Sequence, residues 1–475
     1  MLSIMKKTVV FLVGLIVVFQ MEALSPALKR FVEMPAFAGA NIGLEIKELQ
    51  SGKVLAEYRS GASLIPASNM KLVTTATVLE LAGPDYCFET PLEYDGTIDK
   101  QGVLHGNIHL IGTGDPTIGS EVFNDHDFIS RWVDAVRQAG IKSVMGQVVA
   151  NVAAYDKEVI SPDWTWQNLG NYFAAGVFGL AVYDNMYYLQ FRTGAPGTTP
   201  QILGTMPPMY ELTFQNRLKA GQTGDDDDDG YLHGAPFSNE RTITGTIPAN
   251  RDLFSIKGDI PNPPFKLAEV LTAKLNEAGI TVSGSPKVDD VDRSSYTRFF
   301  VHRSPSLADI IKETNMQSNN LFAEHLFKWM GLQGNQVATR DAAAAVVSDF
   351  WKTRGADVSF LFQHDGCGLS PMNGVPAHFF VQLLTYMRMQ SKYKDTFYAS
   401  LPVAGQSGTL KRFLAGTALA GKIHAKSGSI RRVVCYSGYA VLEGKECVFS
   451  IMVNNYAGSA ANARKAIENL LLSYR

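Results

Sequence analysis

The chain has 475 residues, of which 46% are hydrophobic and 19% are charged. This length and composition exclude global disorder and allow two or three folded domains with ample cores. The formal net charge of −2 gives no reason to expect nucleic acid or an acidic polymer as a partner.

The first 25 residues have the layout of a secretory signal peptide. Lys6 and Lys7 precede an apolar run over residues 8–19, and small residues follow from Ala23 onward. The run is shorter than the roughly 20 residues that a membrane-spanning helix needs. We therefore predict a signal peptide over 1–25, and an uncleaved anchor stays as the alternative because Met21 makes the cleavage site poorly defined.

Strands are predicted at both ends of the mature chain, with helices between them. Residues 41–47 and 54–58 alternate around a Ser51-Gly52 turn, as in a β-hairpin, and residues 68–82 predict a helix that ends at Gly83. Three C-terminal strands and a final amphipathic helix are predicted, the strands at 422–430, 433–442 and 447–454 and the apolar face of the helix at Ala466, Ile467, Leu470 and Leu471. This order predicts one sheet closed by the two termini.

Between residues 86 and 301 the pattern changes to short β-like runs. These runs lie at 106–112, 144–152, 187–192, 210–215 and 242–247, and two helices are predicted at 127–139 and 265–278. We predict an inserted β-rich region, with two more helices at 307–313 and 321–330 beyond it. The acidic run Asp225–Asp229 is predicted to lie on a solvated loop of this region rather than to bind calcium.

Four widely spaced cysteines fit neither a disulfide framework nor a metal site. We predict thiols or at most one bridge for Cys87, Cys367, Cys435 and Cys447. Cys435 and Cys447 are expected on neighbouring strands but not opposite each other.

Ser68 and Lys71 are three residues apart at the start of the predicted helix, so their side chains share one face. A neutral, desolvated Lys71 can take the Ser68 proton and activate a hydroxyl that is otherwise a poor nucleophile. The same S-x-x-K pattern occurs at Ser391–Lys394, so a solvated helix face is the alternative for any single copy.

Two further segments complete a possible acyl-transfer site. Ser318 can relay a proton to a leaving amine, and Asn320 can hold a substrate carbonyl and Lys71, although an ordinary helix N-cap explains the same residues. Lys426 supplies positive charge for a substrate carboxylate, and Gly428 lets another backbone approach. The N–H groups of Ser429 and Ser68 are natural oxyanion donors. Taken alone, Lys426 could be an ordinary edge-strand lysine beside a turn glycine. The three motifs in this order favour an acyl-transfer site over the separate structural explanation of each motif.

The chain resembles the class C low-molecular-mass penicillin-binding proteins, the D-alanyl-D-alanine carboxypeptidase/endopeptidase family. Besides the three motifs, the resemblance rests on Thr314 and on the segments 112–116, 318–324, 365–370 and 401–405, and it covers nearly the whole mature chain. It implies an α+β fold, with a penicillin-binding/β-lactamase-like domain of helices around an antiparallel sheet, built from 26–85 and 302–475. Residues 86–301 would then form a large β-rich insert with two subdomains.

The resemblance implies a serine D,D-peptidase of the periplasm. Ser68 would form an acyl-enzyme with peptidoglycan stem peptides and with β-lactam antibiotics, without a metal or an organic cofactor, and with at most peripheral membrane contact. Ser427, Gly428 and Ser429 would bind substrate, and Ser427 stands where the family usually has Thr.

An aromatic subsite for the diaminopimelate side chain is also implied, with Trp164, Trp166 and Tyr172 as its aromatic residues and Gln167 beside them. Gln167 replaces a frequent acid there, and Asp163 is the candidate substitute. Two other functions stay open at this point, a β-lactamase or esterase and a non-catalytic penicillin sensor.

Overall fold

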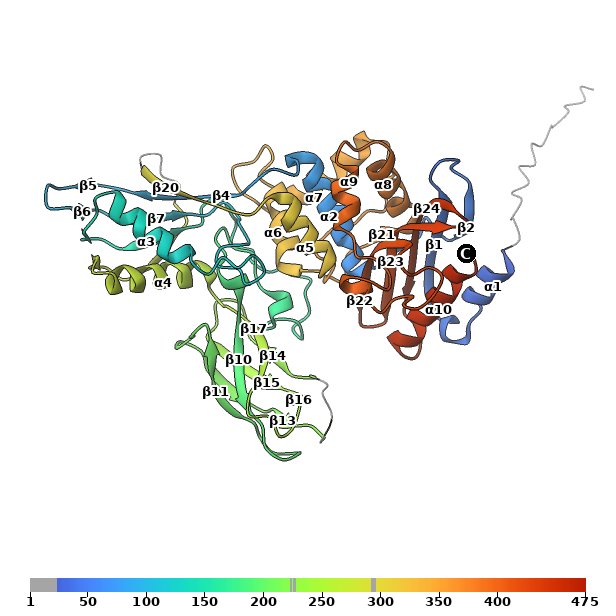
Figure 1. Cartoon of the computed structure of the whole chain (residues 1–475), viewed down its shortest axis with the longest axis horizontal. Helices are drawn as coiled ribbons and strands as arrows, with labels where there is room; N and C mark the ends of the chain where they lie inside the picture. The colour runs from blue at the N-terminus through green and yellow to red at the C-terminus, as the bar shows by residue number, and fades with distance from the viewer. Residues whose placement is uncertain (1–23, 223, 225–227, 292–295) are drawn as a thin grey trace, which may run out of the picture.

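The computed structural model describes residues 24–222, 224, 228–291 and 296–475. Figure 1 shows an elongated molecule in which both ends of the described chain lie at one end and the middle of the chain forms the other. The predicted signal peptide lies outside the described residues except for its last two positions. None of the helices within the described ranges combines the length and apolar character that a membrane span requires.

A five-stranded antiparallel sheet joins the two ends of the chain, as predicted. Its order is β2-β1-β24-β23-β22. The strands are β1 Asn41–Glu48, β2 Val54–Tyr58, β22 Ile423–Ile430, β23 Val433–Leu442 and β24 Lys445–Asn454. The predicted hairpin and the three C-terminal strands are therefore confirmed. β1 pairs with β24 in unbroken register from Asn41↔Asn454 to Glu48↔Cys447, which locks the two ends together.

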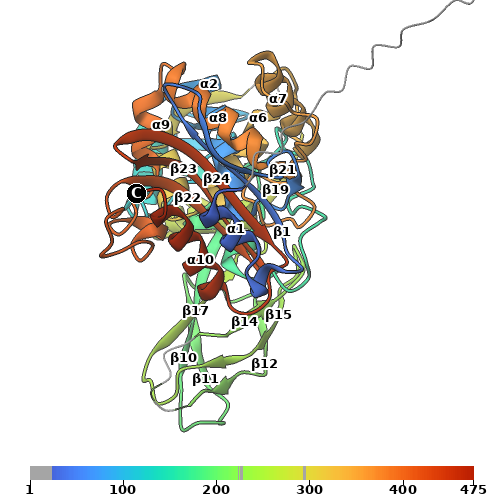
Figure 2. The same ribbon diagram turned by 90° about the vertical axis from the view of Figure 1, so that its right-hand side faces the viewer.

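Helices cover both faces of this sheet because alternate side chains of each strand point to opposite sides. Val434 and Tyr436 of β23 pack with α1 and α10, which Figure 2 shows in front of the sheet. Cys435 and Tyr439 pack into the other core with α2 and α8. The helices are α1 Pro26–Val32, α2 Met70–Ala82, α5 Leu307–Met316, α6 Asn320–Met330, α7 Arg340–Thr353, α8 Ala377–Met389, α9 Lys394–Ser400 and α10 Ala460–Leu472.

The central helix is α2, in which every residue from Met70 to Leu79 is buried. It ends at Gly83, whose φ of 79° favours glycine, so the predicted stop is confirmed. All four cysteines are free thiols. Cys435 lies opposite Met452, and Cys447 lies opposite Ala440, as the predicted offset required.

The chain between α2 and α5 forms two β-rich lobes. The first has the sheets β19-β9-β7-β4-β20 and β18-β8-β6-β5, and its core includes side chains of α3 and α4. Its elements are β4 Glu89–Tyr94, β5 Thr97–Ile98, β6 Val103–His105, β7 Ile108–Ile111, α3 Phe128–Gln138, β8 Ser143–Val144, β9 Val148–Asn151, α4 Pro263–Glu277, β18 Thr281–Val282, β19 Lys287–Asp289 and β20 Thr297–Arg303.

The second lobe has its own small core, formed by the sheets β11-β10-β17, β12-β15-β14 and β13-β16. Its strands are β10 Met186–Arg192, β11 Gln201–Met206, β12 Thr213–Asn216, β13 Lys219–Ala220, β14 Tyr231–His233, β15 Glu240–Thr244, β16 Thr246–Ile247 and β17 Phe254–Asp259. Asp228 and Asp229 are exposed between β13 and β14, whereas the other three residues of the acidic run lie outside the described residues.

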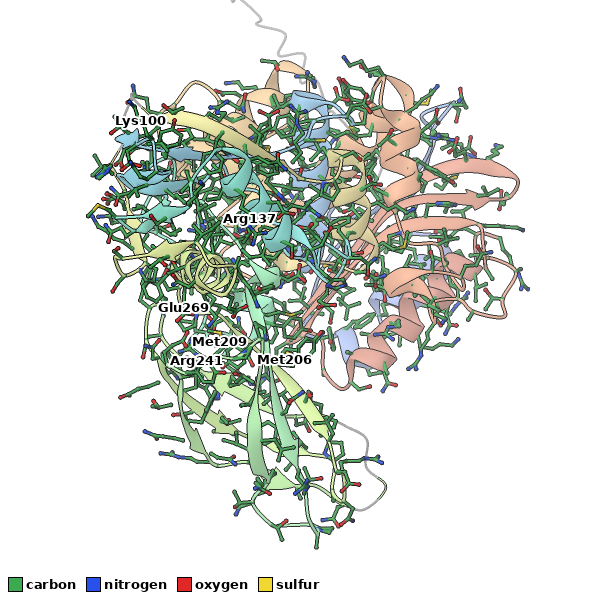
Figure 3. All side chains as sticks on the ribbon, turned by 60° about the vertical axis from the view of Figure 1, so that its left-hand side comes forward. Lys100, Arg137, Met206, Met209, Arg241 and Glu269 are labelled. Atoms are coloured by element: carbon green, nitrogen blue, oxygen red, sulfur yellow. The ribbon has the colours of Figure 1, made fainter. Side chains whose placement is uncertain are left out.

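A buried ion pair lies where the second lobe meets the rest of the molecule, in the region where Figure 3 labels Arg241. Arg241 Nη2 is 3.0 Å from Asp259 Oδ1, and both side chains are almost completely buried. Burial raises the pKa of Asp259 to about 6, against the effect of Arg241. Separating the two side chains would leave a buried charge without its partner. The pair therefore holds the start of β15 against the end of β17.

Candidate active site

Ser68 lies in a tight turn at the start of α2. Residues Ala67–Asn69 form one turn of 3-10 helix, and α2 begins at Met70. Ala67 has a φ of 45°, a left-handed conformation that is unusual for a residue with a side chain. The Ser68 side chain is only partly buried, so its hydroxyl is open to a ligand.

Two glycines from distant segments pack against this turn. A Cβ at Gly428 would lie 2.6 Å from Pro66 O and 3.0 Å from Ser68 N, and a Cβ at Gly368 would overlap the Ala67 carbonyl. The sequence predicted that Gly428 admits another backbone. In the structure that backbone is the chain's own nucleophile turn.

Lys71 holds its side-chain nitrogen among three oxygen atoms. Nζ lies 3.1 Å from Ser68 Oγ, 2.7 Å from Asn320 Oδ1 and 2.8 Å from the carbonyl oxygen of Cys367. The side chain is completely buried. Burial lowers the pKa of Lys71, while the charge of neighbouring acidic groups acts in the opposite direction. Burial therefore favours the neutral amine.

Ser318 lies in the turn between α5 and α6, and Asn320 is the first residue of α6. Ser318 has a φ of 61°, and Asn319 caps α6 by accepting a hydrogen bond from Phe322 N at 3.1 Å. Asn320 accepts from Lys71 and donates through Nδ2 to the Phe173 carbonyl at 2.7 Å. The cap therefore explains Asn319, whereas Asn320 joins Lys71 to the segment that precedes the second lobe.

Lys426 lies on β22 and reaches the same site. Its Nζ donates to Ser318 Oγ at 3.0 Å and to the Ser427 carbonyl at 2.7 Å, and the side chain is completely buried. Burial, and then the charge of Lys71, lower the pKa of Lys426 well below its usual range. Ser427 Oγ donates to Thr409 Oγ1 at 2.8 Å, and Ser429 is exposed. The structure thus brings all three motifs together.

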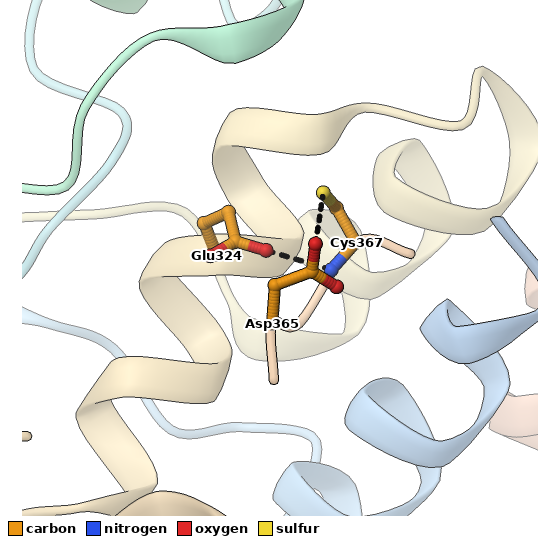
Figure 4. A group of neighbouring side chains, drawn as sticks. All are labelled: Glu324, Asp365 and Cys367. Atoms are coloured by element: carbon orange, nitrogen blue, oxygen red, sulfur yellow. Dashed lines mark hydrogen bonds between the residues drawn. The ribbon is translucent and has the colours of Figure 1, made fainter. Parts of the chain in front are cut away.

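Sequence reasoning missed the support for the Cys367 carbonyl. Glu324 Oε1 accepts the N–H groups of Gly366 and Cys367, both at 2.7 Å. Figure 4 shows the bond from Cys367, with Asp365 beside it. These contacts fix the loop whose carbonyl accepts from Lys71. The segments 318–324 and 365–370 resemble the family, but any residue type can supply a backbone carbonyl, so the sequence does not indicate this role.

Glu324, Asp365 and Cys367 lie close enough together to share a metal ion. Three of the four carboxylate oxygens already accept hydrogen bonds, however, and the fourth, Glu324 Oε2, accepts none and lies 3.7 Å from Arg340 Nη2. Asp365 Oδ1 accepts from Gly368 N and Asn373 Nδ2, both at 2.7 Å, and Oδ2 accepts from Ser370 N at 2.6 Å and Trp164 Nε1 at 2.8 Å. We therefore interpret the group as a brace for the loop. That no metal takes part in the reaction stays a prediction.

The predicted aromatic subsite is only partly assembled. Tyr172 is 46% exposed and lines a pocket that also touches Ser318 and Asn320. Trp164 is 6% exposed and packs beneath the site, where it bonds to Asp365. Gln167 is exposed and outside this pocket, and Asp163 pairs with His364 at 2.8 Å. A substrate-binding role for these residues stays a prediction.

Comparison with known proteins gives consistent results. Residues 24–473 match the D-Ala-D-Ala carboxypeptidase 3 (S13) family. The D-alanyl-D-alanine carboxypeptidase of Actinomadura sp. (strain R39) is 30% identical over 447 residues, which cover 90% of this chain and 80% of the relative. The D-alanyl-D-alanine carboxypeptidase DacB of Haemophilus influenzae is 23% identical, over 88% of this chain and 86% of the relative.

The fold is shared with a solved structure. The crystal structure of penicillin-binding protein 4 (dacB) from Haemophilus influenzae superposes with a TM-score of 0.78 at 21% identity, covering 92% of this chain and 96% of that chain. A structure of the same protein complexed with a β-lactam gives a TM-score of 0.73 over 92% of this chain and 97% of that chain. The predicted α+β class is confirmed, and this chain belongs to the D-Ala-D-Ala carboxypeptidase 3 (S13) family.

Proposed function

We propose that this serine-type D-Ala-D-Ala carboxypeptidase uses Ser68 as its nucleophile, with Lys71 as the general base and Ser318 as the proton donor. The substrate is a peptidoglycan stem peptide that ends in D-Ala-D-Ala, or one cross-linked through D-alanine to diaminopimelate. β-Lactams acylate the same serine. The carboxypeptidase activity follows from family membership.

One observation carries these roles, namely the hydrogen-bond pattern of Lys71. Two of its three oxygen neighbours, Asn320 Oδ1 and the Cys367 carbonyl, can only accept hydrogen bonds. A neutral amine has two N–H donors and one lone pair. If the donors go to these two oxygens, the lone pair is left for the Ser68 hydroxyl, 3.1 Å away. Burial favours this neutral form, so Lys71 is suited to remove the Ser68 proton.

The reaction then proceeds in two steps. As Lys71 takes the proton, Ser68 Oγ bonds to the carbonyl carbon of the penultimate D-alanine. The C–N bond breaks, and the departing nitrogen takes the Ser318 proton, which the proton held by Lys71 then replaces. Lys426 and Ser427 bind the terminal carboxylate, and the N–H groups of Ser68 and Ser429 stabilise the oxyanion. Water then attacks the ester, which releases the shortened peptide and regenerates the Ser68 hydroxyl.

Digestion of purified muropeptides, with products identified by mass, tests this function. We expect loss of one D-alanine from a monomeric pentapeptide and cleavage of D-alanyl cross-links. The β-lactamase alternative is tested by turnover of a chromogenic cephalosporin. A persistent adduct agrees with the peptidase, whereas rapid release of hydrolysed cephalosporin would contradict it.

The pH dependence of acylation follows from the direction of the Lys71 shift. Only the neutral amine accepts a proton, so the acylation rate rises with pH as Lys71 deprotonates, at a pH below the usual range for lysine. The charge of Glu324 raises the pKa of Lys71. We expect Glu324→Gln, which retains an oxygen acceptor for the loop, to move the midpoint to lower pH. The measurement is the rate of labelling by a fluorescent penicillin across the pH range.

Glu277→Gln is the matched control, because Glu277 is exposed and lies on α4, which Figure 1 shows well apart from α2, the helix of Lys71. Its profile should superpose on that of the wild type. A Glu324→Gln profile with an unchanged midpoint, or one displaced to higher pH, would show that Glu324 does not act on the base.

We also propose that the chain acts in the periplasm after removal of residues 1–25. The apolar N-terminal run and the wall-peptide substrate class support this location. The peptidase domain would comprise 26–85 and 302–475, with 86–301 as the insert. N-terminal sequencing of the secreted protein tests the location, and a mature chain that still begins at Met1 would contradict it.

A further inference from the structure

Two neighbouring residues between β9 and β10, Asp163 and Trp164, contact the loop that bears the Cys367 carbonyl. Trp164 Nε1 donates to Asp365 Oδ2 at 2.8 Å, and Asp163 Oδ2 lies 2.8 Å from His364 Nδ1. Trp164 and Asp365 are buried, whereas the other pair is partly exposed to water. A buried hydrogen bond to a carboxylate is strong, and an exposed ion pair is weak. Trp164 is therefore the main attachment of this segment to the loop.

The Trp164 ring also packs with both segments that supply the acceptors of Lys71. It belongs to a small apolar cluster whose buried members are Trp164, Ala174, Ala323 and Cys367. Ala323 lies on α6, which begins with Asn320, the first acceptor. Cys367 is the residue whose carbonyl is the second acceptor. One side chain thus contacts the two parts of the molecule between which the Lys71 amine is held.

Asp365 shapes the loop through its carboxylate. Oδ1 accepts from Gly368 N at 2.7 Å and Oδ2 accepts from Ser370 N at 2.6 Å, so the carboxylate sets the path of the backbone that follows Cys367. The indole N–H of Trp164 shares Oδ2 with Ser370. Because the carboxylate is buried, bulk water does not replace a donor that is lost, and the carboxylate is drawn toward its remaining donors. The indole therefore acts on the Cys367 carbonyl through Asp365.

We infer that Trp164 is a positioning residue for the general base, which keeps both acceptors of Lys71 in place without touching the reacting atoms. The inference rests on the proposed function, in which neutral Lys71 takes the Ser68 proton. The amine directs its lone pair at Ser68 only while its two N–H groups point at Asn320 and the Cys367 carbonyl. A shift of either acceptor lets the amine turn, and proton removal slows. The first, non-covalent binding of a ligand does not depend on that lone pair.

The test is the acylation of the full-length mature enzyme by a fluorescent penicillin over a range of concentrations that reaches saturation. This range separates the acylation rate constant from the dissociation constant of the non-covalent complex. We expect Trp164→Phe, which removes the indole N–H and retains an aromatic ring, to lower the acylation rate constant about tenfold. The dissociation constant should remain that of the wild type.

Trp351→Phe is the matched control. Trp351 of α7 is also completely buried, and its Nε1 donates to Thr77 Oγ1 of α2 at the same distance of 2.8 Å. We expect the two variants to lose similar stability and Trp351→Phe to be acylated at the wild-type rate. An unchanged rate in Trp164→Phe, or equal slowing in both variants, would overturn the inference. Weaker penicillin binding with an unchanged acylation rate constant would also overturn it, because Trp164 would then contact the ligand.

Replacement of Trp164 by 3-benzothienylalanine decides the question if Trp164→Phe does not fold. This amino acid has nearly the shape of tryptophan and carries sulfur in place of the N–H group, so the cluster stays filled. We expect the same slowing of acylation, and a wild-type rate would overturn the inference. A wild-type enzyme that is not acylated at Ser68 would instead contradict the proposed function, so the two failures are distinguishable.

Discussion

Ser68→Ala is expected to lower D-alanine release by about 10⁴-fold or more and to abolish covalent labelling by penicillin. The substitution removes the only atom that forms the acyl bond, while the base and the binding groups remain. The Ser68 hydroxyl contributes one hydrogen bond, to Lys71, so the free energy of unfolding should change by only about 1 kcal/mol. The measurements are release of D-alanine from the pentapeptide and fluorescence of the labelled band.

Ser391→Ala is the appropriate control, because Ser391–Lys394 has the same S-x-x-K spacing. Ser391 lies between α8 and α9, and its Oγ donates to Glu80 near the C-terminal end of α2 at 2.5 Å. We expect this variant to be labelled at the wild-type rate. Equal labelling of wild type and Ser68→Ala would remove Ser68 from the mechanism.

Gly368→Ala is expected to reduce both activity and stability, although residue 368 contributes no side chain to the site. Gly368 has a φ of 88°, and an added Cβ would overlap the Ala67 carbonyl next to the nucleophile. Either the Ser68 turn or the loop bearing the Cys367 carbonyl has to move, which separates Ser68 from Lys71. We expect a loss of about 3 kcal/mol in the free energy of unfolding and at least a hundredfold slower acylation. Urea titration and labelling rates measure the two effects.

Gly355→Ala separates backbone strain from the clash. Gly355 has a similar φ of 81°, but a Cβ there would meet nothing within 4 Å. We expect it to cost only about 1 kcal/mol and to leave the acylation rate near that of the wild type. Wild-type acylation by Gly368→Ala would show that the close approach at Gly368 does not position Ser68.

The elements that surround the nucleophile were predictable because their sequence patterns are local. The alternation of residues 41–47 and 54–58 and the Gly83 stop of α2 each depend on a few neighbouring residues, and the structure contains both features. The three motifs were predictable for another reason. Acyl transfer needs a nucleophile, a base and a cation, and side chains of those types are visible in the sequence.

The rest of the site depends on atoms that sequence patterns do not display. The carbonyl of Cys367 accepts from Lys71, and any residue type at 367 offers the same carbonyl. Asn320 donates to the Phe173 carbonyl, 147 residues away in sequence, and no local pattern specifies that contact. Some strands of the two lobes, such as β13 and β18, have only two residues each. They are too short to show the alternation of apolar and polar residues by which a strand is predicted.

Mass spectrometry of the enzyme with benzylpenicillin tests most directly whether Ser68 is the acylated nucleophile. We expect the intact protein to gain the mass of one penicillin and to keep it for many minutes. After tryptic digestion, the added mass should lie on the peptide of residues 60–71 and be assigned to Ser68 by fragmentation. An adduct on any other residue, or hydrolysed penicillin accumulating without an adduct, would contradict the assignment.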